Sequence, residues 1–236
     1  MFIIAGEKSG DNLGAKLISQ IRVLKPEVMI HGIGGLRMEG VGLQSIFPMA
    51  QINLMGFLEI LPHIFRLKKL INQTVDDIIK FTPDVLVTID SPGFNFRVVK
   101  ELRKRNLKTK YVHYVAPTVW AYKPERAAKT AKLYDLLLSI IPWEKPYFKK
   151  EGLKTEFIGH PLFEDISLLS YDKKIKYRSE LGLNNNAKII SIMPGSRIGE
   201  IKKHKNILIE TINKLLTEYR NIKFFILPTR ENEQFV

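Results

Sequence analysis

Asp90 is the side chain of this sequence that best fits a role in proton transfer. It ends the apolar run Val85–Ile89 and is followed by the turn Ser91–Gly93. A carboxylate at the carboxyl end of a buried parallel strand faces the ligand crevice, where partial loss of hydration raises its pKa toward the range of a general base. The alternative is an aspartate that only caps the helix expected to begin near Phe94.

Two glycine-rich loops offer backbone that a ligand could approach closely. The first, Ala5–Asp11, reads AGEKSGD, and Ser9 or Asp11 could cap the helix that follows. Its spacing matches neither a Walker A loop nor the dinucleotide fingerprint, so it assigns no nucleotide. The second, His31–Met38, has three glycines within four residues. A ligand-binding loop and a plain tight turn remain open for both.

A third loop, Pro194–Arg197, joins an expected strand to an expected helix. Backbone amides at a helix N-terminus, together with the guanidinium of Arg197, would form a site for a diphosphate. A Pro-Gly turn with an exposed arginine is the alternative.

Two apolar segments lie where surface loops would be polar. Trp120 and Tyr122 follow Pro117, which suggests contact with sugar or acyl groups, although aromatic residues near strands usually belong to the core. The segment Leu54–Leu70 is apolar at its start and basic at its end, a pattern typical of interfacial segments that place lysines on phosphate. A helix buried against the sheet would explain Leu54–Leu70 equally well.

The charge of the chain favours an anionic partner. Its 236 residues carry a net charge of +13, and residues 100–154 alone hold fourteen basic and five acidic side chains. These basic residues are scattered over several expected elements without a nucleic-acid-binding motif. An anionic membrane or a phospholipid-like substrate therefore fits better than nucleic acid. A solvated charged face is the alternative.

Cysteine and histidine usage narrows the chemistry further. The absence of cysteine excludes disulfides, a cysteine nucleophile and thiolate metal sites, and permits a reducing compartment. His113 and His160 have no metal-ligand spacing to other ligating residues, so we expect neither a metal nor another cofactor. No apolar run reaches the roughly 18 residues of a membrane-spanning helix, and the first residues do not read as a signal peptide. We therefore expect a cytoplasmic protein.

The elements that must position these residues alternate between strand and helix, which predicts an α/β fold with a parallel sheet. The expected strands are Phe2–Ala5, Val28–Gly32, Asp84–Ile89, Thr109–Val115, Leu136–Ile141, Thr155–Ile158, Lys188–Met193 and Lys223–Leu227. The helical patterns between them include Asp11–Leu24, Phe65–Phe81, Phe94–Arg105, Pro124–Leu133 and Ile201–Tyr219. We expect a complete domain over residues 1–165 and an incomplete second domain over residues 166–236.

Several of these stretches together resemble those of the lipid-A-disaccharide synthase family. Its members are glycosyltransferases of bacterial lipid A assembly. The matching blocks are Ala5–Asp11, Gly32–Met38, Met55–Leu61, Ile89–Asn95, His113–Ala121, Phe157–Leu162 and Met193–Arg197. They follow one another along essentially the whole chain. One position departs from the family, which usually has a second aspartate where Gly93 stands.

The resemblance implies a GT-B architecture of two Rossmann-like domains, of which the first binds the acceptor and the second the UDP-sugar. The chain is then expected to hold the first domain and the opening of the second, without the segments that hold uridine and ribose. The implied reaction joins UDP-2,3-diacylglucosamine to 2,3-diacylglucosamine 1-phosphate, with inversion, giving a β(1→6) disaccharide and UDP. The truncated chain alone is not expected to catalyse it. A separate chain with the missing C-terminal half would complete the enzyme, and the alternative is an inactive remnant that binds membrane or acyl-sugar.

The resemblance also assigns roles to residues. Asp90 is the implied general base. The implied acceptor-binding residues are Glu7, Ser9, Asp11, Met55, Phe57, Asn95 and Trp120. The donor diphosphate is expected at Ser196 and Arg197. The expected location is the cytoplasmic face of the inner membrane, where the protein would be held peripherally by the anionic surface.

Overall fold

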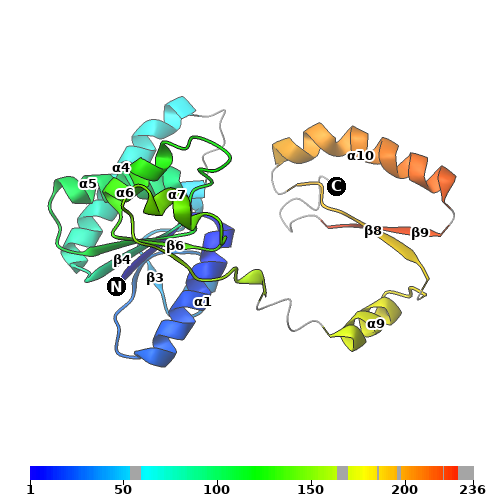
Figure 1. Ribbon diagram of the computed structural model, residues 1–236, viewed down its shortest axis with the longest axis horizontal. Coiled ribbons are helices and arrows are strands. Elements are labelled where there is room, and N and C mark those ends of the chain that lie inside the picture. Colours follow the sequence, from blue (N-terminus) through cyan, green and yellow to red (C-terminus); the bar gives the residue numbers. More distant parts are fainter. Residues whose placement is uncertain (54–59, 164–169, 185, 196–197, 220, 228–236) are drawn as a thin grey trace. The chain divides into compact units, whose positions relative to one another are not determined.

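The computed structural model describes residues 1–53, 60–163, 170–184, 186–195, 198–219 and 221–227 (Figure 1). The chain divides into two compact units, Met1–Asp165 and Ile166–Val236. No helix within the described residues is both long enough and apolar enough to cross a membrane.

The first unit is built on a parallel sheet of seven strands in the order β3-β2-β1-β4-β5-β6-β7. Every neighbouring pair in it runs parallel. The strands are β1 (Phe2–Ala5), β2 (His31–Ile33), β3 (Gln44–Ser45), β4 (Val85–Ile89), β5 (Lys110–Tyr114), β6 (Leu136–Ser139) and β7 (Thr155–Phe157). Because all strands are parallel, their carboxyl ends lie along one edge of the sheet.

The strand order reverses at β1, which has β2 on one side and β4 on the other. Ligands of open parallel sheets bind outside the carboxyl ends of the strands at such a reversal. In the register of the β1–β4 pair, Ala5 lies opposite Ile89. The loops that begin at Gly6 and Asp90 therefore leave the sheet side by side.

Helices cover both faces of this sheet. Those described in the first unit are α1 (Lys8–Leu24), α2 (Leu36–Glu39), α3 (Ala50–Asn53), α4 (Ile60–Phe81), α5 (Pro92–Lys104), α6 (Arg126–Leu133) and α7 (Lys145–Lys149). Helix α1 lies against one face, and α4, α5, α6 and α7 lie over the other (Figure 1).

The core consists of two layers, one on each side of the sheet. Along β1, Phe2 and Ile4 belong to the cluster that includes residues of α4, α5 and α6, while Ile3 and Ala5 belong to the cluster that includes Ile18 of α1. All four residues of β1 are buried. A strand covered on both faces needs apolar side chains at every position, and each fully buried large one contributes about 1.5–3 kcal/mol. This explains the unbroken apolar run at the start of the sequence.

The second unit contains α9 (Tyr171–Glu180), β8 (Lys188–Ile192), α10 (Ile198–Glu218) and β9 (Ile222–Ile226). Strands β8 and β9 form a parallel pair connected by α10, which is one βαβ unit. Among its described residues, Ala187, Pro194 and Ile201 are the buried apolar side chains, whereas Ile207 and Leu216 of α10 are exposed.

Candidate functional site

Asp90 lies at the strand reversal, where the loops after β1 and β4 touch. A Cβ atom built on Gly6 would lie 2.5 Å from the hydroxyl oxygen of Ser91, so the close approach of these loops requires glycine at position 6. Asp90 is half-buried, and this burial raises the pKa of its carboxyl group, partly offset by a hydrogen bond from the backbone of Ser91. A carboxylate with a raised pKa at a strand-reversal crevice is suited to accept a proton near neutral pH.

The turn that presents Asp90 has a strained backbone. Asp90 and Ser91 both have positive φ angles, 47° and 45°, although neither is glycine. Val115, which follows β5 beside this turn, has a φ of 76°. Each such conformation costs on the order of 1–3 kcal/mol and persists only where surrounding contacts enforce it. Strain of this kind is concentrated at functional sites.

Three hydrogen bonds, made with Tyr114 and Asn95, hold this turn in place. The amide nitrogen of Asp90 donates to the carbonyl oxygen of Tyr114 on β5 at 2.9 Å. The side-chain amide of Asn95, on α5, donates to the carbonyl oxygens of Asp90 at 2.7 Å and Ile89 at 3.2 Å. Asn95 is fully buried, and its Oδ1 has no hydrogen-bond partner among the described residues. Asn95 therefore fixes the backbone of Asp90 and keeps one acceptor uncommitted beside it.

Asp11 connects the two glycine-rich loops. Its buried carboxylate accepts hydrogen bonds from the backbone amides of Gly35, Arg37 and Met38, at 2.8–3.0 Å. These amides belong to the loop after β2 and the first turn of α2, so both carboxylate oxygens are used to hold that loop against α1. Close to Asp11, Glu7 is half-buried at the start of α1 and Ser9 is exposed.

A second carboxylate, Glu144, lies beyond the ends of β5 and β6. It is 1% exposed. Its Oε2 lies 2.7 Å from the hydroxyl oxygen of Ser139, and its Oε1 accepts a long hydrogen bond of 3.4 Å from the indole of Trp120. Sequence reasoning missed Glu144, which comes several residues after the end of β6, whereas Asp90 directly follows β4.

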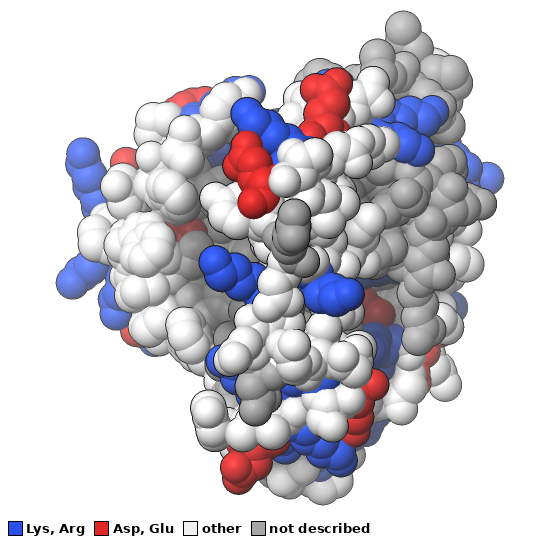
Figure 2. Space-filling view, turned by 90° about the vertical axis from the view of Figure 1, so that its right-hand side faces the viewer, with Lys and Arg blue, Asp and Glu red and all other residues white. Residues whose placement is uncertain are grey.

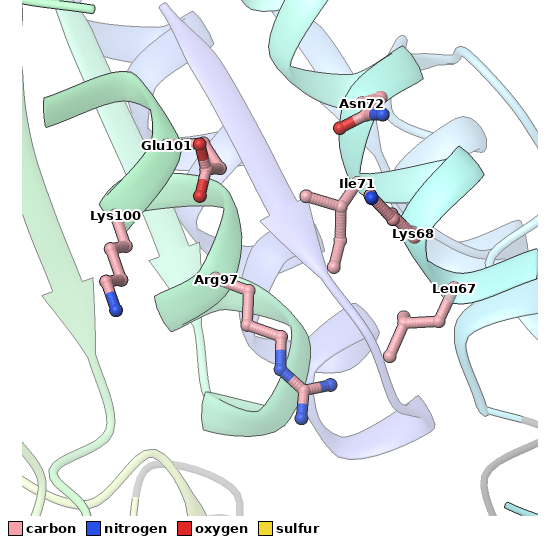
Figure 3. Close-up of a pocket in the computed structure, with 7 residues that line it drawn as sticks. All are labelled: Leu67, Lys68, Ile71, Asn72, Arg97, Lys100 and Glu101. Carbon is pink, nitrogen blue, oxygen red and sulfur yellow. The ribbon is translucent and has the colours of Figure 1, made fainter. Parts of the chain in front are cut away.

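A groove of about 480 Å³ separates α4 from α5 on the outside of the first unit. Arg97 and Leu67 extend into it from α5 and α4, and Lys68 lies on the α4 side (Figure 3). Its full lining is Leu67, Lys68, Ile71, Asn72, Arg97, Lys100 and Glu101. The carboxylate of Glu101 is paired with Lys104 at 2.7 Å and also interacts with Lys100, so the groove holds three cations and one carboxylate.

On one face of the molecule the positive charge is dispersed. On the face drawn in Figure 2, Lys and Arg side chains are scattered among acidic and neutral ones and do not form a single patch. This distribution agrees with the scatter of basic residues along the sequence.

The structure brings some of the predicted site residues together. Glu7, Ser9 and Asp11 lie on the loop and helix beside the Asp90 turn, and Asn95 holds that turn. Trp120 lies further along the same sheet edge, after β5. Four of the predicted site residues lie outside the described residues: Met55, Phe57, Ser196 and Arg197.

Comparison with solved structures agrees with this architecture. The UDP-GlcNAc 2-epimerase of Neisseria meningitidis superposes with a TM-score of 0.59 at 16% identity, covering 98% of this chain and 65% of that one. A glycosyltransferase of Rickettsia africae superposes with a TM-score of 0.55 at 14% identity, covering 98% and 68%. At these identities the likeness concerns the fold alone, and it confirms the expected Rossmann-like α/β class.

Sequence comparison identifies the family. The family model for lipid-A-disaccharide synthetase matches residues 1–235. The lipid-A-disaccharide synthase of Rickettsia bellii is 47% identical over 229 residues, which are 97% of this chain and 59% of that protein. The enzyme of Rickettsia akari is 47% identical over 238 residues, covering 100% and 60%. The chain thus spans about three fifths of the length of these relatives, and it belongs to the lipid-A-disaccharide synthetase family.

Proposed function

We propose that this chain carries the acceptor-binding unit, and part of the donor-binding unit, of an inverting glycosyltransferase of lipid A assembly. The donor is UDP-2,3-diacylglucosamine and the acceptor is 2,3-diacylglucosamine 1-phosphate. The products are a β(1→6) disaccharide 1-phosphate and UDP. The observation that carries this proposal is the half-buried Asp90, held on a strained turn at the strand reversal in a chain of this family.

In the proposed reaction, the Asp90 carboxylate accepts the proton of the acceptor's 6′-hydroxyl. The hydroxyl oxygen then attacks the anomeric carbon of the donor from the face opposite UDP, and the bond between that carbon and the diphosphate oxygen breaks. One bond forms as the other breaks, so the configuration inverts. Ser196, Arg197 and the amides at the start of α10 would meet the charge that develops on the leaving diphosphate.

The acceptor would lie along the carboxyl edge of the sheet in the first unit. Glu7 and Ser9 would contact it beside Asp90, and Trp120 would offer an apolar ring surface further along this edge. Asp11 would act indirectly, because its carboxylate is occupied by three backbone amides. Met55 and Phe57 would contact acyl chains. Asn95 would hold the Asp90 turn.

The enzyme would work at the cytoplasmic face of the inner membrane, since its substrates carry acyl chains. The groove between α4 and α5 supports a peripheral contact there, because three cations and two apolar side chains line it. Such a lining suits an anionic headgroup and the first carbons of its chains.

The match of residues 1–235 to one family model favours this enzyme over a non-catalytic remnant. Because the chain spans 59% of the R. bellii relative, we propose that transfer also needs a portion equivalent to the rest of that protein. The test mixes the 236-residue chain with the C-terminal portion of the R. bellii enzyme and follows disaccharide formation by mass spectrometry.

The mixture should form the disaccharide, and the chain alone should release no UDP above background. Absence of product from the mixture, when the intact R. bellii enzyme is active under the same conditions, would argue for the remnant. Turnover by the chain alone would show that the donor site lies within it.

A further inference from the structure

The contacts of Glu144 do not fit an ionised carboxylate. The hydroxyl oxygen of Ser139 lies 2.7 Å from Oε2 of Glu144 and also 2.7 Å from the carbonyl oxygen of Ile141. A serine hydroxyl has one hydrogen, and a carbonyl oxygen can only accept. If Glu144 were ionised, the single hydrogen of Ser139 would have to be shared between two acceptors that both lie at 2.7 Å.

A proton on Glu144 resolves this conflict. The carboxylic acid then donates to the oxygen of Ser139, and Ser139 donates to the carbonyl of Ile141. The oxygen of Ser139 also accepts a bond from the Ile141 amide at 3.2 Å, so all of these groups are satisfied. Burial raises the pKa of Glu144 above its ordinary value, and the hydrogen bonds with Ser139, Trp120 and the Ile141 backbone offset this only in part.

The charged neighbours of Glu144 do not reverse this conclusion. Lys145, the next residue, pairs with Glu156 on β7 at 2.9 Å. The other polar groups that contact Glu144 are the neutral Ser139, the indole of Trp120 and the Ile141 backbone. No cation among the described residues therefore compensates a negative charge on this buried group.

The other oxygen of Glu144 contacts one of a pair of surface tryptophans. Oε1 accepts the indole N–H of Trp120, and the rings of Trp120 and Trp143 meet edge to face with centroids 6.2 Å apart. Both rings stay accessible, at 44% and 57% exposure. Two exposed indoles that contact each other at the sheet edge form an apolar surface with polar N–H groups, which suits a ligand with both apolar and polar parts.

We propose that Glu144 is a neutral carboxylic acid that positions Trp120 against Trp143, and that the two indoles form a platform for an acylated sugar. Trp143 is thereby added to the binding surface, with Glu144 as its positioning residue. The identity of the ligand rests on the proposed function. The protonation state of Glu144 does not.

The first experiment measures that protonation state in the 236-residue chain by infrared difference spectroscopy between the native protein and Glu144→Gln. A carbonyl stretch of a protonated carboxylic acid should be present at neutral pH and vanish in the variant. A carboxylate signal in its place would overturn the proposal. This readout requires no substrate, so it stands even if the proposed function fails.

The second experiment measures binding of 2,3-diacylglucosamine 1-phosphate, dispersed in neutral detergent, by tryptophan fluorescence. Glutamine retains an acceptor for Trp120 and an N–H for Ser139, so Glu144→Gln should bind within about twofold of the native chain. Glu144→Ala and Trp143→Ala should each bind roughly tenfold more weakly. Trp143→Ala keeps the test valid if Glu144→Ala does not fold.

The matched control is Tyr147→Ala, which removes another exposed aromatic ring, on α7. It should bind like the native chain. If Glu144→Gln weakened binding as much as Glu144→Ala does, the neutral form would be excluded. Unchanged binding by Trp143→Ala would contradict the proposal that the two indoles form the binding surface.

Discussion

The hydroxyl oxygen of Thr88 lies 2.8 Å from Nδ1 of His113 in the interior of the first unit, between neighbouring strands β4 and β5. The same hydroxyl lies 3.0 Å from the phenol oxygen of Tyr134, whose ring stacks on the imidazole. His113 is fully buried, and burial lowers its pKa to about 3. The imidazole is therefore neutral over the whole physiological range, and it serves the sheet as a polar packing group.

The buried His113 should make the first unit sensitive to mild acid. In the unfolded chain a histidine gains a proton near pH 6.5, whereas folded His113 does not do so until about pH 3. Between these values the unfolded state binds a proton that the folded state cannot, so stability falls as pH falls. From about pH 7.5 to about pH 5, His113 should account for a loss of about 2 kcal/mol in the free energy of unfolding.

The measurement is urea unfolding followed by tryptophan fluorescence, which reports on the first unit because Trp120 and Trp143 both lie in it. In His113→Phe the loss between the two pH values should shrink by this amount. The control, His160→Asn, changes a half-buried histidine and should retain the full loss. Equal pH dependence in the native chain and His113→Phe would contradict the assignment.

Asp11 should contribute strongly to the stability of the first unit. Its carboxylate accepts three backbone N–H groups, and Asp11→Asn turns an amide N–H toward one of them. Hydrogen bonds to a charged group contribute about 1.5–3 kcal/mol each, and a buried donor left unpaired adds a further cost. The free energy of unfolding should fall by about 2–4 kcal/mol in Asp11→Asn.

The control for Asp11 is Asp76→Asn, at an exposed ion pair with Arg105. A surface pair contributes about 0–1 kcal/mol, so this variant should unfold nearly as the native chain does. If Asp11→Asn were equally mild, the loop after β2 would be held by other contacts.

The groove between α4 and α5 should bind anionic bilayers. Replacing Lys68, Arg97 and Lys100 together by alanine should weaken binding to vesicles with anionic phospholipid roughly a hundredfold, at about 1 kcal/mol per cation. Binding by the native chain should also weaken as salt rises, since screening acts beyond about 8 Å at physiological ionic strength. Vesicle flotation measures both effects.

A matched variant tests whether the position of the three cations or only the net charge of the chain determines binding to the bilayer. Replacing Lys202, Lys203 and Lys205 on α10 by alanine removes the same three charges from exposed positions of the second unit. This variant should bind anionic vesicles like the native chain. Equal loss in both triple variants would mean that net charge alone attracts the bilayer, and binding to neutral vesicles would exclude the electrostatic account.

The central strands could be predicted because burial on both faces leaves an unbroken apolar run, as in Val85–Ile89. The edge strand Gln44–Ser45 and the short helix Lys145–Lys149 were missed, since neither is long enough to show a period. The second strand was placed at Val28–Gly32, but it runs His31–Ile33, because Val28 and Met29 belong to the loop before it.

Some features of the site could likewise be predicted from the sequence, and others could not. The position of Asp90 at the end of β4 follows from its place after an apolar run. Its left-handed backbone has no sequence signal, because that conformation is normally marked by glycine. The burial of Glu144 depends on Ser139 and on Trp120, which lies 24 positions away, so it follows only from the folded chain.

Asp90→Asn should abolish most of the turnover of the reconstituted enzyme. The amide has nearly the shape of the carboxylate but cannot accept the proton of the acceptor hydroxyl, so kcat should fall roughly 10²-fold or more with little change in the acceptor KM. Because burial raises the pKa of Asp90, native activity should decline, as pH falls, at a higher pH than an ordinary carboxyl would give.

The matched control for Asp90 is Asp84→Asn, an exposed aspartate at the opposite end of the same strand. It should keep both the rate and the pH profile.

Asn95→Ala removes the side-chain amide that fixes the carbonyls of Ile89 and Asp90, so it should lower kcat through the loosened turn. In the Asp90→Asn background, Asn95→Ala should lower kcat little further, because the carboxylate that Asn95 positions is already absent. Near-native turnover by Asp90→Asn would exclude Asp90 as the base, and independent, additive losses would separate Asn95 from it.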